Sequence, residues 1–421
     1  MWHITDQAIV FLQSQSGASL FLLFWYVIIF EIPRYSFAFV ATLIATIRTD
    51  RHPEHRHVPG RVSVIIAGHN EQDSIERCVM SLHEQSRPPD EIIVVSDGST
   101  DRMPEKLRDL QRRGLIQESH VVQMRGGKSA GFNLAAGRAT GDFVVNVDCD
   151  CTFDRHALRD IIAPFADPDI GAAAGNIIVR NPMVSVVTAC QAIEYMISIS
   201  QGKRAANLTD TMTCVSGAFG AFRREALERV GGLDSGGGED LDVTLRLRSA
   251  HYKTIFAADA ICYTDVPETL MALTRQRFRW EQDAVRLRYR KHGELMNPFG
   301  RRFSVMELLH ELDFIFFNIV AAVAFPIYLV WLFAEYGNFA PVILMAAQIG
   351  MWALDVITFT MAAWMTPKAK ALTLVPYILA YSPFYGFVMK MVRVAAYLNE
   401  WIFDASYKDP YVPKKVHMVR K

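Results

Sequence analysis

Residues 144–154 read VVNVDCDCTFD, a β-branched run that leads into two aspartates and two cysteines. Cys149 and Cys151 could suggest a thiolate metal site or a redox pair, whereas Asp148 and Asp150 suggest a carboxylate site for a hard cation. Side chains alternate between the two faces of an extended segment, so the aspartates should point one way and the cysteines the other. The two interpretations therefore place different chemistry on different faces.

The sequence does not supply the further ligands that a thiolate metal site at Cys149 and Cys151 would need. A structural zinc site needs four ligands, and the other cysteines are scattered singly at positions 78, 190, 214 and 262. A reducing cytoplasm also disfavours a disulfide. Two carboxylates at a strand end instead suit Mg²⁺ or Mn²⁺, which prefer oxygen ligands; the alternative is a solvated acidic loop. We expect Cys149→Ser and Cys151→Ser to keep activity, and Asp150→Ala to abolish metal-dependent activity.

Two earlier segments have a similar composition, residues 61–66 (RVSVII) and 91–96 (EIIVVS), and helical patterns cover 73–84 and 129–138. Strands that alternate with helices at this spacing predict βαβ units in a parallel sheet, where ligands bind outside the carboxyl ends of the strands. Polar loops follow all three strands, and they read AGHNE at 67–71, DGSTD at 97–101 and DCD at 148–150. One such loop is an ordinary turn or cap, but three together predict a ligand site.

The tract RGGKS at residues 125–129 resembles the end of a P-loop. A P-loop requires glycine five residues before Gly127, and Val122 occupies that position, so the spacing excludes an NTPase of this class. What remains is Lys128, a lysine that follows two glycines and can approach a phosphate closely.

Two motifs follow the strand-rich region. GGGED at 236–240 precedes a helical pattern; its glycines can simply cap and connect, but a carboxylate there can also reach into a cleft as a general base. In QRFRW at 276–280, Gln276, Arg279 and Trp280 share one helical face. Residues 269–291 contain seven basic side chains together with apolar ones, which favours a helix at a membrane surface. Trp280 is then either an interfacial anchor or a platform that stacks on a sugar.

Apolar segments lie near both ends of the chain. Residues 20–47 exceed the roughly 20 residues that cross a bilayer, and Glu31, Pro33 and Arg34 interrupt them, which predicts one kinked span. A signal peptide is the alternative, but no lysine or arginine precedes the apolar run. Further spans are expected at 316–333, 342–365 and 371–396, the last of them re-entrant or split.

Charged residues orient these segments. By the positive-inside rule the middle of the chain lies in the cytoplasm, because basic residues flank it on both sides: Arg48, Arg51, Arg56, Arg61, Arg286, Arg288, Arg290, Lys291, Arg301 and Arg302. The tail 414–421 is also basic. Charges within spans are costly, so five of them either line a channel or pair with other groups: Glu31, Arg34, Asp355, Lys390 and Arg393.

The whole chain has 421 residues, which allows two or three structural units. Its 44 basic and 44 acidic residues give a formal net charge of zero. This balance does not indicate a nucleic-acid partner.

Asp97 in VSDGSTD, the DCD of 148–150, the GED that ends at Asp240 and QRFRW occur in this order and are flanked by spans. This pattern resembles the processive family 2 glycosyltransferases, which are the cellulose, chitin, hyaluronan and poly-N-acetylglucosamine synthases, over roughly residues 60–310. The resemblance implies an α/β GT-A (Rossmann-like) catalytic domain in the cytoplasm, combined with transmembrane helices and amphipathic interface helices. The expected units are a span at 1–47, the GT-A domain at 48–265, interface helices at 266–311, C-terminal spans at 312–404 and a basic tail at 405–421.

The resemblance also implies roles for individual residues. Those that would bind the nucleotide sugar are Glu71, Asp97, Lys128, Asp148, Asp150 and Arg279. Asp97 would hold the base and Lys128 the diphosphate, and Asp150 together with Asp148 would bind Mg²⁺ or Mn²⁺, with Asp150 the direct ligand. AGHNE replaces the usual Pro-x-Tyr-Asn-Glu form around Glu71. Asp240 would be the catalytic base, and the acceptor-binding residues would be Glu239, Gln276, Arg279 and Trp280.

The activity implied by the resemblance is that of a membrane-embedded inverting glycosyltransferase. It would polymerise a β-linked polysaccharide from UDP-glucose or UDP-N-acetylglucosamine and extrude it across the bacterial inner membrane. Its partners would be the UDP-sugar donor, the growing polysaccharide and membrane lipid, and the sequence leaves accessory subunits or a homo-oligomer open. One alternative is a non-processive enzyme that adds a single sugar to a lipid. Another is a transporter with a nucleotide-sensing domain.

Overall fold

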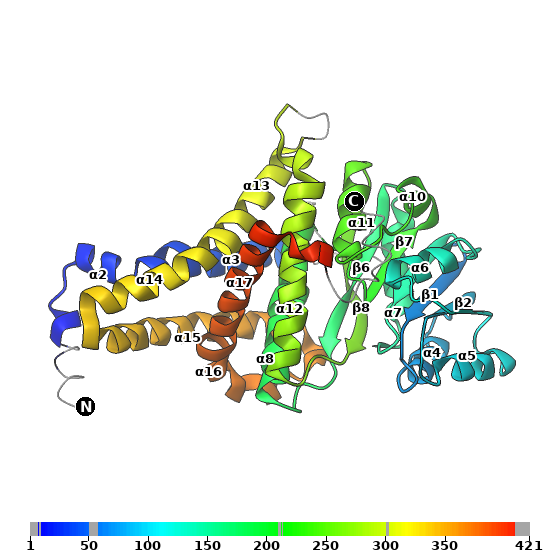
Figure 1. Cartoon of the computed structure of the whole chain (residues 1–421), viewed down its shortest axis with the longest axis horizontal. Helices are drawn as coiled ribbons and strands as arrows, with labels where there is room; N and C mark the ends of the chain where they lie inside the picture. Colours follow the sequence, from blue (N-terminus) through cyan, green and yellow to red (C-terminus); the bar gives the residue numbers. More distant parts are fainter. Residues whose placement is uncertain are drawn as a thin grey trace.

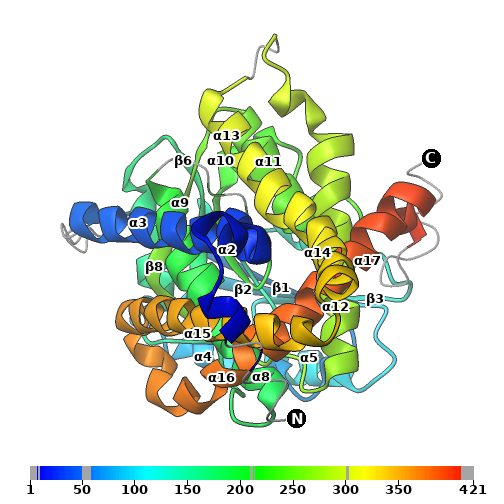
Figure 2. The ribbon, with the colours of Figure 1, turned by 90° about the vertical axis from the view of Figure 1, so that its left-hand side faces the viewer.

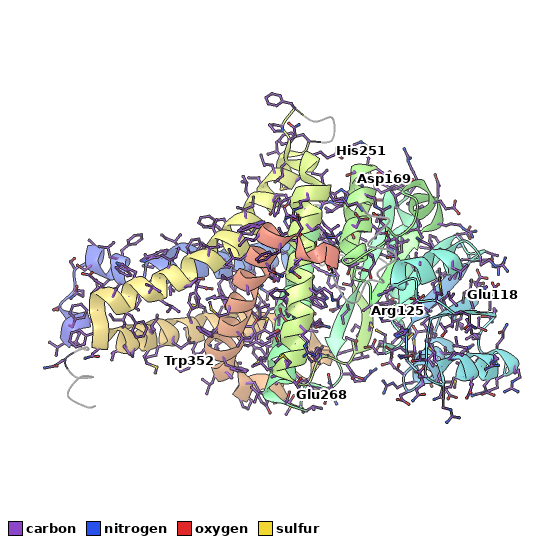
Figure 3. The ribbon with its side chains drawn as sticks, in the orientation of Figure 1. Glu118, Arg125, Asp169, His251, Glu268 and Trp352 are labelled. Carbon is purple, nitrogen blue, oxygen red and sulfur yellow. The ribbon has the colours of Figure 1, made fainter. Side chains whose placement is uncertain are left out.

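The computed structural model describes residues 7, 10–49, 58–208, 212, 214–299 and 303–408. An α/β domain lies at one end of the molecule and long helices extend from it at the other (Figure 1). Figure 3 places the side chains of Glu118 and Asp169 on the α/β part and that of Trp352 among the long helices. The basic residues at 51, 56, 301 and 302 and the tail 414–421, from which the orientation in the membrane is predicted, lie outside the described residues.

The α/β domain is built on one sheet with the strand order β3-β2-β1-β4-β7-β6-β8-β5. β1 pairs in parallel with β2 and β4, and β2 pairs in parallel with β3, so the predicted parallel βαβ arrangement is confirmed for these strands. The rest of the sheet is mixed, because β7 runs antiparallel to both β4 and β6. The strand bounds are Val62–Gly68 (β1), Glu91–Asp97 (β2), Glu118–Val122 (β3), Phe143–Val147 (β4), Thr152–Phe153 (β5), Ile170–Val179 (β6), Phe219–Arg223 (β7) and Lys253–Thr264 (β8).

Helices cover both faces of this sheet, which is why β1 and β4 read as continuous apolar runs. One core places Val64 and Ile66 of β1 against α4 (Ile75–His83), α5 (Met103–Arg112) and α7 (Ala157–Ile162). The other places Ile65 of β1 against the helices on the opposite face: α6 (Lys128–Ala136), α10 (Arg224–Arg229) and α11 (Glu239–Ser249). The helical patterns predicted at 73–84 and 129–138 correspond to α4 and α6, each slightly shorter than expected.

Among the described residues, three helical runs are long and apolar enough to cross a membrane: Val27–Ile44, Val305–Met365 and Ala371–Phe403. The first run starts as a π-helix, η1 (Val27–Glu31), which leads directly into α3 (Ile32–Thr49). Such a π turn is a recognised cause of an irregular helix axis. The short α2 (Gly17–Leu23) precedes it.

The second run folds back on itself. It comprises α13 (Val305–Phe314), η6 (Ile315–Val320), α14 (Ala321–Tyr336), η7 (Gly337–Phe339) and α15 (Ala340–Met365). The 3₁₀ turn η7 reverses the chain, so that α15 returns beneath α14 in Figure 1. Seen from the helical end, α2, α14 and α15 lie in front of β1 and β2 (Figure 2).

The third run is broken, as the sequence predicts for its last segment. After η8 (Pro367–Ala369) it starts as a 3₁₀-helix, η9 (Ala371–Tyr377). It continues through the short α16 (Ile378–Ala380) and the π-helix η10 (Tyr381–Gly386), and it becomes regular only in α17 (Phe387–Phe403), before the final turn η11 (Ala405–Lys408).

Charges in these runs have partners. Lys390 lies 2.5 Å from Glu31, Arg393 lies 2.9 Å from Glu281, and Asp355 accepts hydrogen bonds from Tyr35 and Ser382. The cavity among Glu31, Lys390 and Arg393 measures only about 10 Å³, and Arg34 also lines it. Of the two explanations that the sequence allows, pairing rather than a channel lining accounts for Glu31, Asp355, Lys390 and Arg393 in this conformation.

Helix α12 (Leu270–Val285), which carries QRFRW, lies between the α/β domain and α17 (Figure 1). The π-helix η4 (Arg286–Lys291) and the 3₁₀-helix η5 (Gly293–Met296) extend it. The expectation of a cationic helix face at the membrane surface is wrong for three of its basic residues. Arg277, Arg286 and Arg288 are buried and pair with Glu194, Asp283 and Glu311, because this helix is packed on both sides.

The remaining helices connect the sheet to this region. They are η2 (Ala163–Ala166), α8 (Val186–Tyr195), the π-helix η3 (Met196–Gln201) and α9 (Gly202–Asn207). Ser185 caps α8 through a reciprocal pair of hydrogen bonds with Thr188. Their packing brings Tyr195 and Ile199 to the same cavity as the ends of the strands.

Candidate active site

A cavity of about 750 Å³ lies at the carboxyl ends of β1 and β4. It extends from the loops that follow these strands to the side of α12. Nine of the ten residues that were given site roles from the sequence line it: Glu71, Lys128, Asp148, Asp150, Glu239, Asp240, Gln276, Arg279 and Trp280. The structure therefore brings together motifs that are separated by up to two hundred residues in the chain.

The loops after β1 and β2 form one connected structure. Asn70 has a left-handed backbone, with φ of 61°, and its Oδ1 accepts hydrogen bonds from the N–H groups of Thr100 and Asp101. In return, the Asp101 carboxylate accepts from the N–H of Gln72 at 3.0 Å. Asparagine tolerates this backbone conformation better than most residues. The two loops that were predicted to meet at the sheet edge are thus held together directly.

Asp97 has a different position from the other predicted site residues. It is buried, and its two carboxylate oxygens accept hydrogen bonds from the N–H groups of Gly126 and Gly127 at 2.6 and 2.7 Å. It is not among the residues that line the cavity. Its carboxylate therefore fixes the loop before α6, and its role in holding a nucleotide base stays a prediction.

Lys128 is the first residue of α6, after Gly127 with φ of 93°. Its Nζ lies 2.5 Å from Oδ1 of Asp148, 3.1 Å from the carbonyl oxygen of Gly217 and 3.8 Å from Oε1 of Glu239. Burial lowers the pKa of Lys128, but the charges of Asp148 and Glu239 outweigh it and raise the pKa above its ordinary value. Lys128 therefore remains a cation within the cavity.

The Asp148–Cys151 segment is not extended as the sequence predicts. β4 ends at Val147, and the N–H of Cys151 donates to the carbonyl of Asp148 at 3.1 Å, which closes a turn before β5. Cys149 and Cys151 are nevertheless buried in the core, and Asp148 and Asp150 are partly exposed in the cavity, although Cys149 also contributes to the cavity lining. All six cysteines are free thiols.

Negative charge is concentrated at this end of the cavity. Burial raises the pKa of Asp150, and the neighbouring Asp148 raises it further. Burial likewise raises the pKa of Glu71, which Asp150 and Asp148 increase and a hydrogen bond from Ser74 opposes. These shifts show that the carboxylates lack full compensation by the protein.

The carboxylates can be tested as ligands for a divalent cation. Within the described part of the chain, no group of three or more His, Cys, Asp or Glu side chains is placed to hold a metal ion. Asp150 and Asp148 supply two carboxylates, and one oxygen of Asp148 already accepts from Lys128. Mg²⁺ characteristically binds through one or two carboxylates together with substrate phosphates, so this donor set fits a metal that arrives with a diphosphate.

Asp240 and Glu239 begin α11, after Gly238 with φ of 68°. Oδ2 of Asp240 accepts from the N–H of Gly217 at 3.2 Å, and Oδ1 accepts from the N–H of Leu241 at 2.8 Å. Burial raises the pKa of Glu239 to about 7; Asp240 adds to this rise and Lys128 opposes it. The Asp240 carboxylate is thus held in a defined orientation by two backbone donors.

Gly217 joins the two halves of the cavity and was not singled out from the sequence. Its carbonyl accepts from Lys128 and from Asn146, while its N–H donates to Asp240. A Cβ atom at this position would lie 3.0 Å from Nζ of Lys128. The only sequence signal was a glycine shortly before β7.

Residues 63–231 match the model of the family described as Glycosyl transferase family 2. The chain carries a glycosyl transferase family 2 domain. The resemblance that the motifs suggested is thereby confirmed, and the match covers the strands that build the carboxylate end of the cavity.

Relatives of this glycosyl transferase domain include two bacterial synthases. The chain is 32% identical over 231 residues to the poly-beta-1,6-N-acetyl-D-glucosamine synthase of Staphylococcus epidermidis. The aligned residues make up 54% of this chain and 55% of that protein. It is 30% identical over 252 residues to the synthase of the same name from Staphylococcus aureus (strain MSSA476), covering 59% and 60%. The matches thus span a little over half the length of these curated relatives.

A solved structure is similar over most of its length. The mannosyltransferase PcManGT from Pyrobaculum calidifontis, in complex with GDP-Man and Mn²⁺, superposes with a TM-score of 0.53 at 20% sequence identity. The match covers 90% of this chain and 99% of that one. The GT-A fold predicted for the glycosyl transferase domain is confirmed.

Arg277, the unassigned second residue of QRFRW, orders the helical end of the cavity. Its guanidinium pairs with Glu194 of α8 at 2.6 Å and lies 4.4 Å from the ring centroid of Trp280. Glu194 also accepts from the hydroxyl of Tyr385 at 2.6 Å. The sequence contained Arg277 in a recognised motif, but its partners come from segments far away in the chain.

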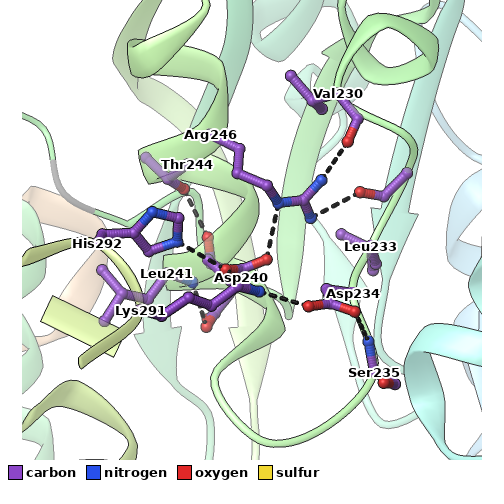
Figure 4. Close-up of polar contacts among 12 residues, drawn as sticks. Val230, Leu233, Asp234, Ser235, Asp240, Leu241, Thr244, Arg246, Lys291 and His292 are labelled. Atoms are coloured by element: carbon purple, nitrogen blue, oxygen red, sulfur yellow. Dashed lines mark hydrogen bonds and ion pairs between the residues drawn. The ribbon is translucent and has the colours of Figure 1, made fainter. Parts of the chain in front are cut away.

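A second group of residues that sequence reasoning missed holds α11 in place (Figure 4). Asp242 is almost fully buried, and its carboxylate accepts from Arg246 at 2.8 Å, Lys291 at 2.6 Å and His292 at 2.8 Å. Burial raises the pKa of Asp242, but the hydrogen bonds from His292 and Lys291 outweigh it and hold the pKa well below its ordinary value. Because Asp242 follows Asp240 by two residues, this network fixes the start of α11 relative to η4.

Proposed function

We propose that this chain is an inverting membrane glycosyltransferase that transfers a hexosyl residue from a UDP-sugar to a growing β-linked polysaccharide. UDP-N-acetylglucosamine is the donor of first choice, because the relatives are named as synthases of poly-beta-1,6-N-acetyl-D-glucosamine. UDP-glucose is the second donor to test. We also propose the division into units given by the sequence, with the catalytic domain at residues 48–265.

One observation carries the proposal. Gly217 binds the cation Lys128 through its carbonyl and the carboxylate of Asp240 through its N–H, at 3.1 and 3.2 Å. A group that attracts a diphosphate and a group that can accept a proton therefore meet at a single residue in one cavity. Inverting transfer requires this pair, since a base acts on the acceptor and positive charge stabilises the leaving group.

The chemistry follows from this placement. The acceptor hydroxyl loses its proton to Asp240 as its oxygen attacks the anomeric carbon in line with the departing diphosphate. The new glycosidic C–O bond forms while the bond from the anomeric carbon to the phosphate oxygen breaks. The electron pair of the broken bond leaves with the diphosphate, near Lys128 and Arg279. An α-linked donor therefore gives a β-linked product.

The carboxylates at the strand ends serve the donor. Asp150 and Asp148 would hold Mg²⁺ or Mn²⁺, which supplies positive charge to the leaving diphosphate. Asp148 would also keep Lys128 in place through the 2.5 Å contact between them. We keep Glu71 and Asp97 as nucleotide-binding residues. For Asp97 to bind a nucleotide, at least one of its carboxylate oxygens must give up its hydrogen bond from the N–H of Gly126 or Gly127.

The acceptor would lie against α12. Trp280 offers an aromatic face for a sugar ring and is 39% exposed, which leaves surface for a ligand. Gln276 and Arg279 line the same part of the cavity, and Glu239 lies beside Asp240. The apolar helical runs support an integral membrane protein, and we place the catalytic domain in the cytoplasm, at the bacterial inner membrane, with the polymer extruded across it.

The test is to offer the membrane-embedded full chain a panel of UDP-sugars with Mg²⁺ or Mn²⁺ and to size the product. We expect a polymer from UDP-N-acetylglucosamine or UDP-glucose and no product without a divalent cation. A product one sugar longer than a lipid acceptor would favour the non-processive alternative. No turnover of any sugar nucleotide would contradict the proposal altogether.

A further inference from the structure

Lys203 is a partly buried cation that lines the helical side of the cavity and that the mechanism does not use. It belongs to α9, just after the π-helix η3, and it lines the cavity together with Ser198 and Ile199 of η3. Its Nζ donates a hydrogen bond to Oγ of Ser216 at 2.5 Å. An ammonium group carries three donor hydrogens, so this bond leaves further donors for another group.

The charge of Lys203 is not balanced in the way that the charge of Lys128 is. Lys128 lies against Asp148 and Glu239, whereas Lys203 forms no ion pair with any residue that the structure describes. Burial lowers the pKa of Lys203, although Cys214 and Asp240 oppose this shift. A partly buried cation whose hydrogen-bond partner is a neutral hydroxyl has donor hydrogens left over, and an acceptor from a ligand would stabilise it.

The position of Lys203 relates it to the acceptor rather than to the donor. Its partner Ser216 directly precedes Gly217, whose N–H binds the carboxylate of Asp240. The acceptor hydroxyl must approach Asp240, so the sugar that carries it lies beside Ser216. Lys203 lines the same cavity and is tied through Ser216 to the residue that binds Asp240, so it is within reach of a substituent of that sugar.

The chemistry of an ammonium group favours one kind of substituent. It donates to a carbonyl oxygen and repels a second ammonium group, and this repulsion is strong in a partly buried site. We propose that Lys203 makes the enzyme select acceptor sugars that carry an acetamido group, through its carbonyl oxygen, over acceptors that carry a free amine. This inference rests on the proposed function and names the acceptor class of the same site.

The experiment uses the full chain in membranes with UDP-N-acetylglucosamine and Mn²⁺. Two acceptors are compared, a short β-1,6-linked N-acetylglucosamine oligosaccharide and its de-N-acetylated form, and kcat/KM is measured for each. We expect the wild type to prefer the acetylated acceptor by about 10-fold or more, the range of a hydrogen bond to a charged group. Lys203→Met should bring this preference to within about threefold, because both the donor and the like charge are lost.

Two further variants separate recognition from support of the loop. Ser216→Ala removes the hydrogen bond to Lys203 but keeps the ammonium group, so the preference for the acetylated acceptor should persist. Lys203→Gln keeps a neutral donor, removes the repulsion and should raise the activity on the amine-bearing acceptor relative to the acetylated one. It also provides a second measurement if Lys203→Met does not fold.

The outcomes distinguish the inference from the proposed function. An unchanged preference in Lys203→Met and Lys203→Gln would overturn the role of Lys203 in selection. An equal loss with both acceptors, reproduced by Ser216→Ala, would also overturn it and show that Lys203 only supports the Ser216–Gly217 loop. If the wild type transfers to neither acceptor and hydrolyses no donor, the proposed function itself fails.

Discussion

The two ends of the cavity bury charge in opposite ways. At the end formed by the loops after β1 and β4, Glu71, Asp148 and Asp150 lie close together, and burial and mutual repulsion raise the pKa values of Glu71 and Asp150. At the end formed by α12 and η4, the cavity-lining Arg277 pairs with Glu194 at 2.6 Å and the cavity-lining Arg288 pairs with Glu311. Acidic side chains are thus crowded together at the first end, whereas Arg277 and Arg288 at the second end are each paired with a carboxylate.

This difference indicates what each end can do. Crowded carboxylates are stabilised when a cation binds, so the strand end is suited to a ligand that brings positive charge with it. Paired and buried arginines have no such need, and they order the side chains around them, as Arg277 does for Trp280. The strand end is thus suited to binding and chemistry, and the α12 end to holding a surface of fixed shape. The following variants test this contrast.

Asp240→Asn has the largest expected effect. The amide keeps the shape of the carboxylate and can still accept a hydrogen bond from Gly217, but it cannot take a proton. Transfer should fall by about 10²- to 10⁴-fold, the usual contribution of a general base, while UDP binding is retained. Radiolabelled transfer and calorimetric UDP binding measure the two quantities.

The control is Asp234→Asn, an aspartate of the same segment that pairs with Lys291 outside the cavity. Near-normal transfer by Asp240→Asn would remove Asp240 from the role of base.

Asp150→Asn tests the carboxylate end directly. Loss of a metal ligand removes several kcal/mol of charge stabilisation, so transfer at moderate Mn²⁺ should fall by at least about 10²-fold and recover in part at high Mn²⁺. A titration of activity against Mn²⁺ concentration measures this. Cys149→Ser, next in sequence but with a buried side chain, should keep activity and the Mn²⁺ dependence of the wild type. If Cys149→Ser abolished activity and Asp150→Asn did not, the proposal that the carboxylates rather than the thiols bind the metal would be wrong.

Arg277→Ala tests the α12 end through stability. It leaves the partly buried Glu194 without its cation, and breaking a fully buried pair costs about 3–5 kcal/mol, so we expect a loss of up to about this size. We expect a clear fall in the thermal midpoint of the protein in detergent. The matched control is Arg102→Ala, whose ion pair with Glu105 has side chains that are 80% and 62% exposed, so no measurable change is expected. Equal effects of the two variants would contradict the view that α12 is held by buried pairs.

Asp242→Asn has the smallest expected effect and depends on pH. The variant loses part of the hydrogen bonding to Lys291 and His292, which costs about 1–3 kcal/mol at neutral pH. Because the folded protein holds the pKa of Asp242 below its ordinary value, this contribution is complete above about pH 4 and is lost as the pH falls further. The difference in thermal midpoint between wild type and variant should therefore narrow below about pH 4. A constant difference from pH 7 to pH 3 would contradict the role of the charge.

Much of the strand end could be predicted from the sequence. The runs at 61–66, 91–96 and 143–147 correspond to β1, β2 and β4, and the polar loops after β1 and β4 line the cavity. Local periodicity and chain order were sufficient, because parallel neighbours necessarily bring their carboxyl ends to one edge. The turn at Asp148 and the capture of Asp97 by Gly126 and Gly127 were not predictable in this way, since both depend on hydrogen bonds that leave no periodic pattern.

The sequence by itself thus determined the parallel half of the sheet, the carboxylates at its edge, the order of the motifs and the presence of apolar helices. Only the tertiary structure decided how charge is balanced around them. Arg277 meets Glu194 across 83 residues of chain, His292 meets Asp242 across 50, and Lys203 reaches the neutral Ser216 without an ion pair among the described residues. The physical reason is that a residue's charge is visible in the sequence, whereas the burial and the partner that set its energy depend on which distant segments pack against it.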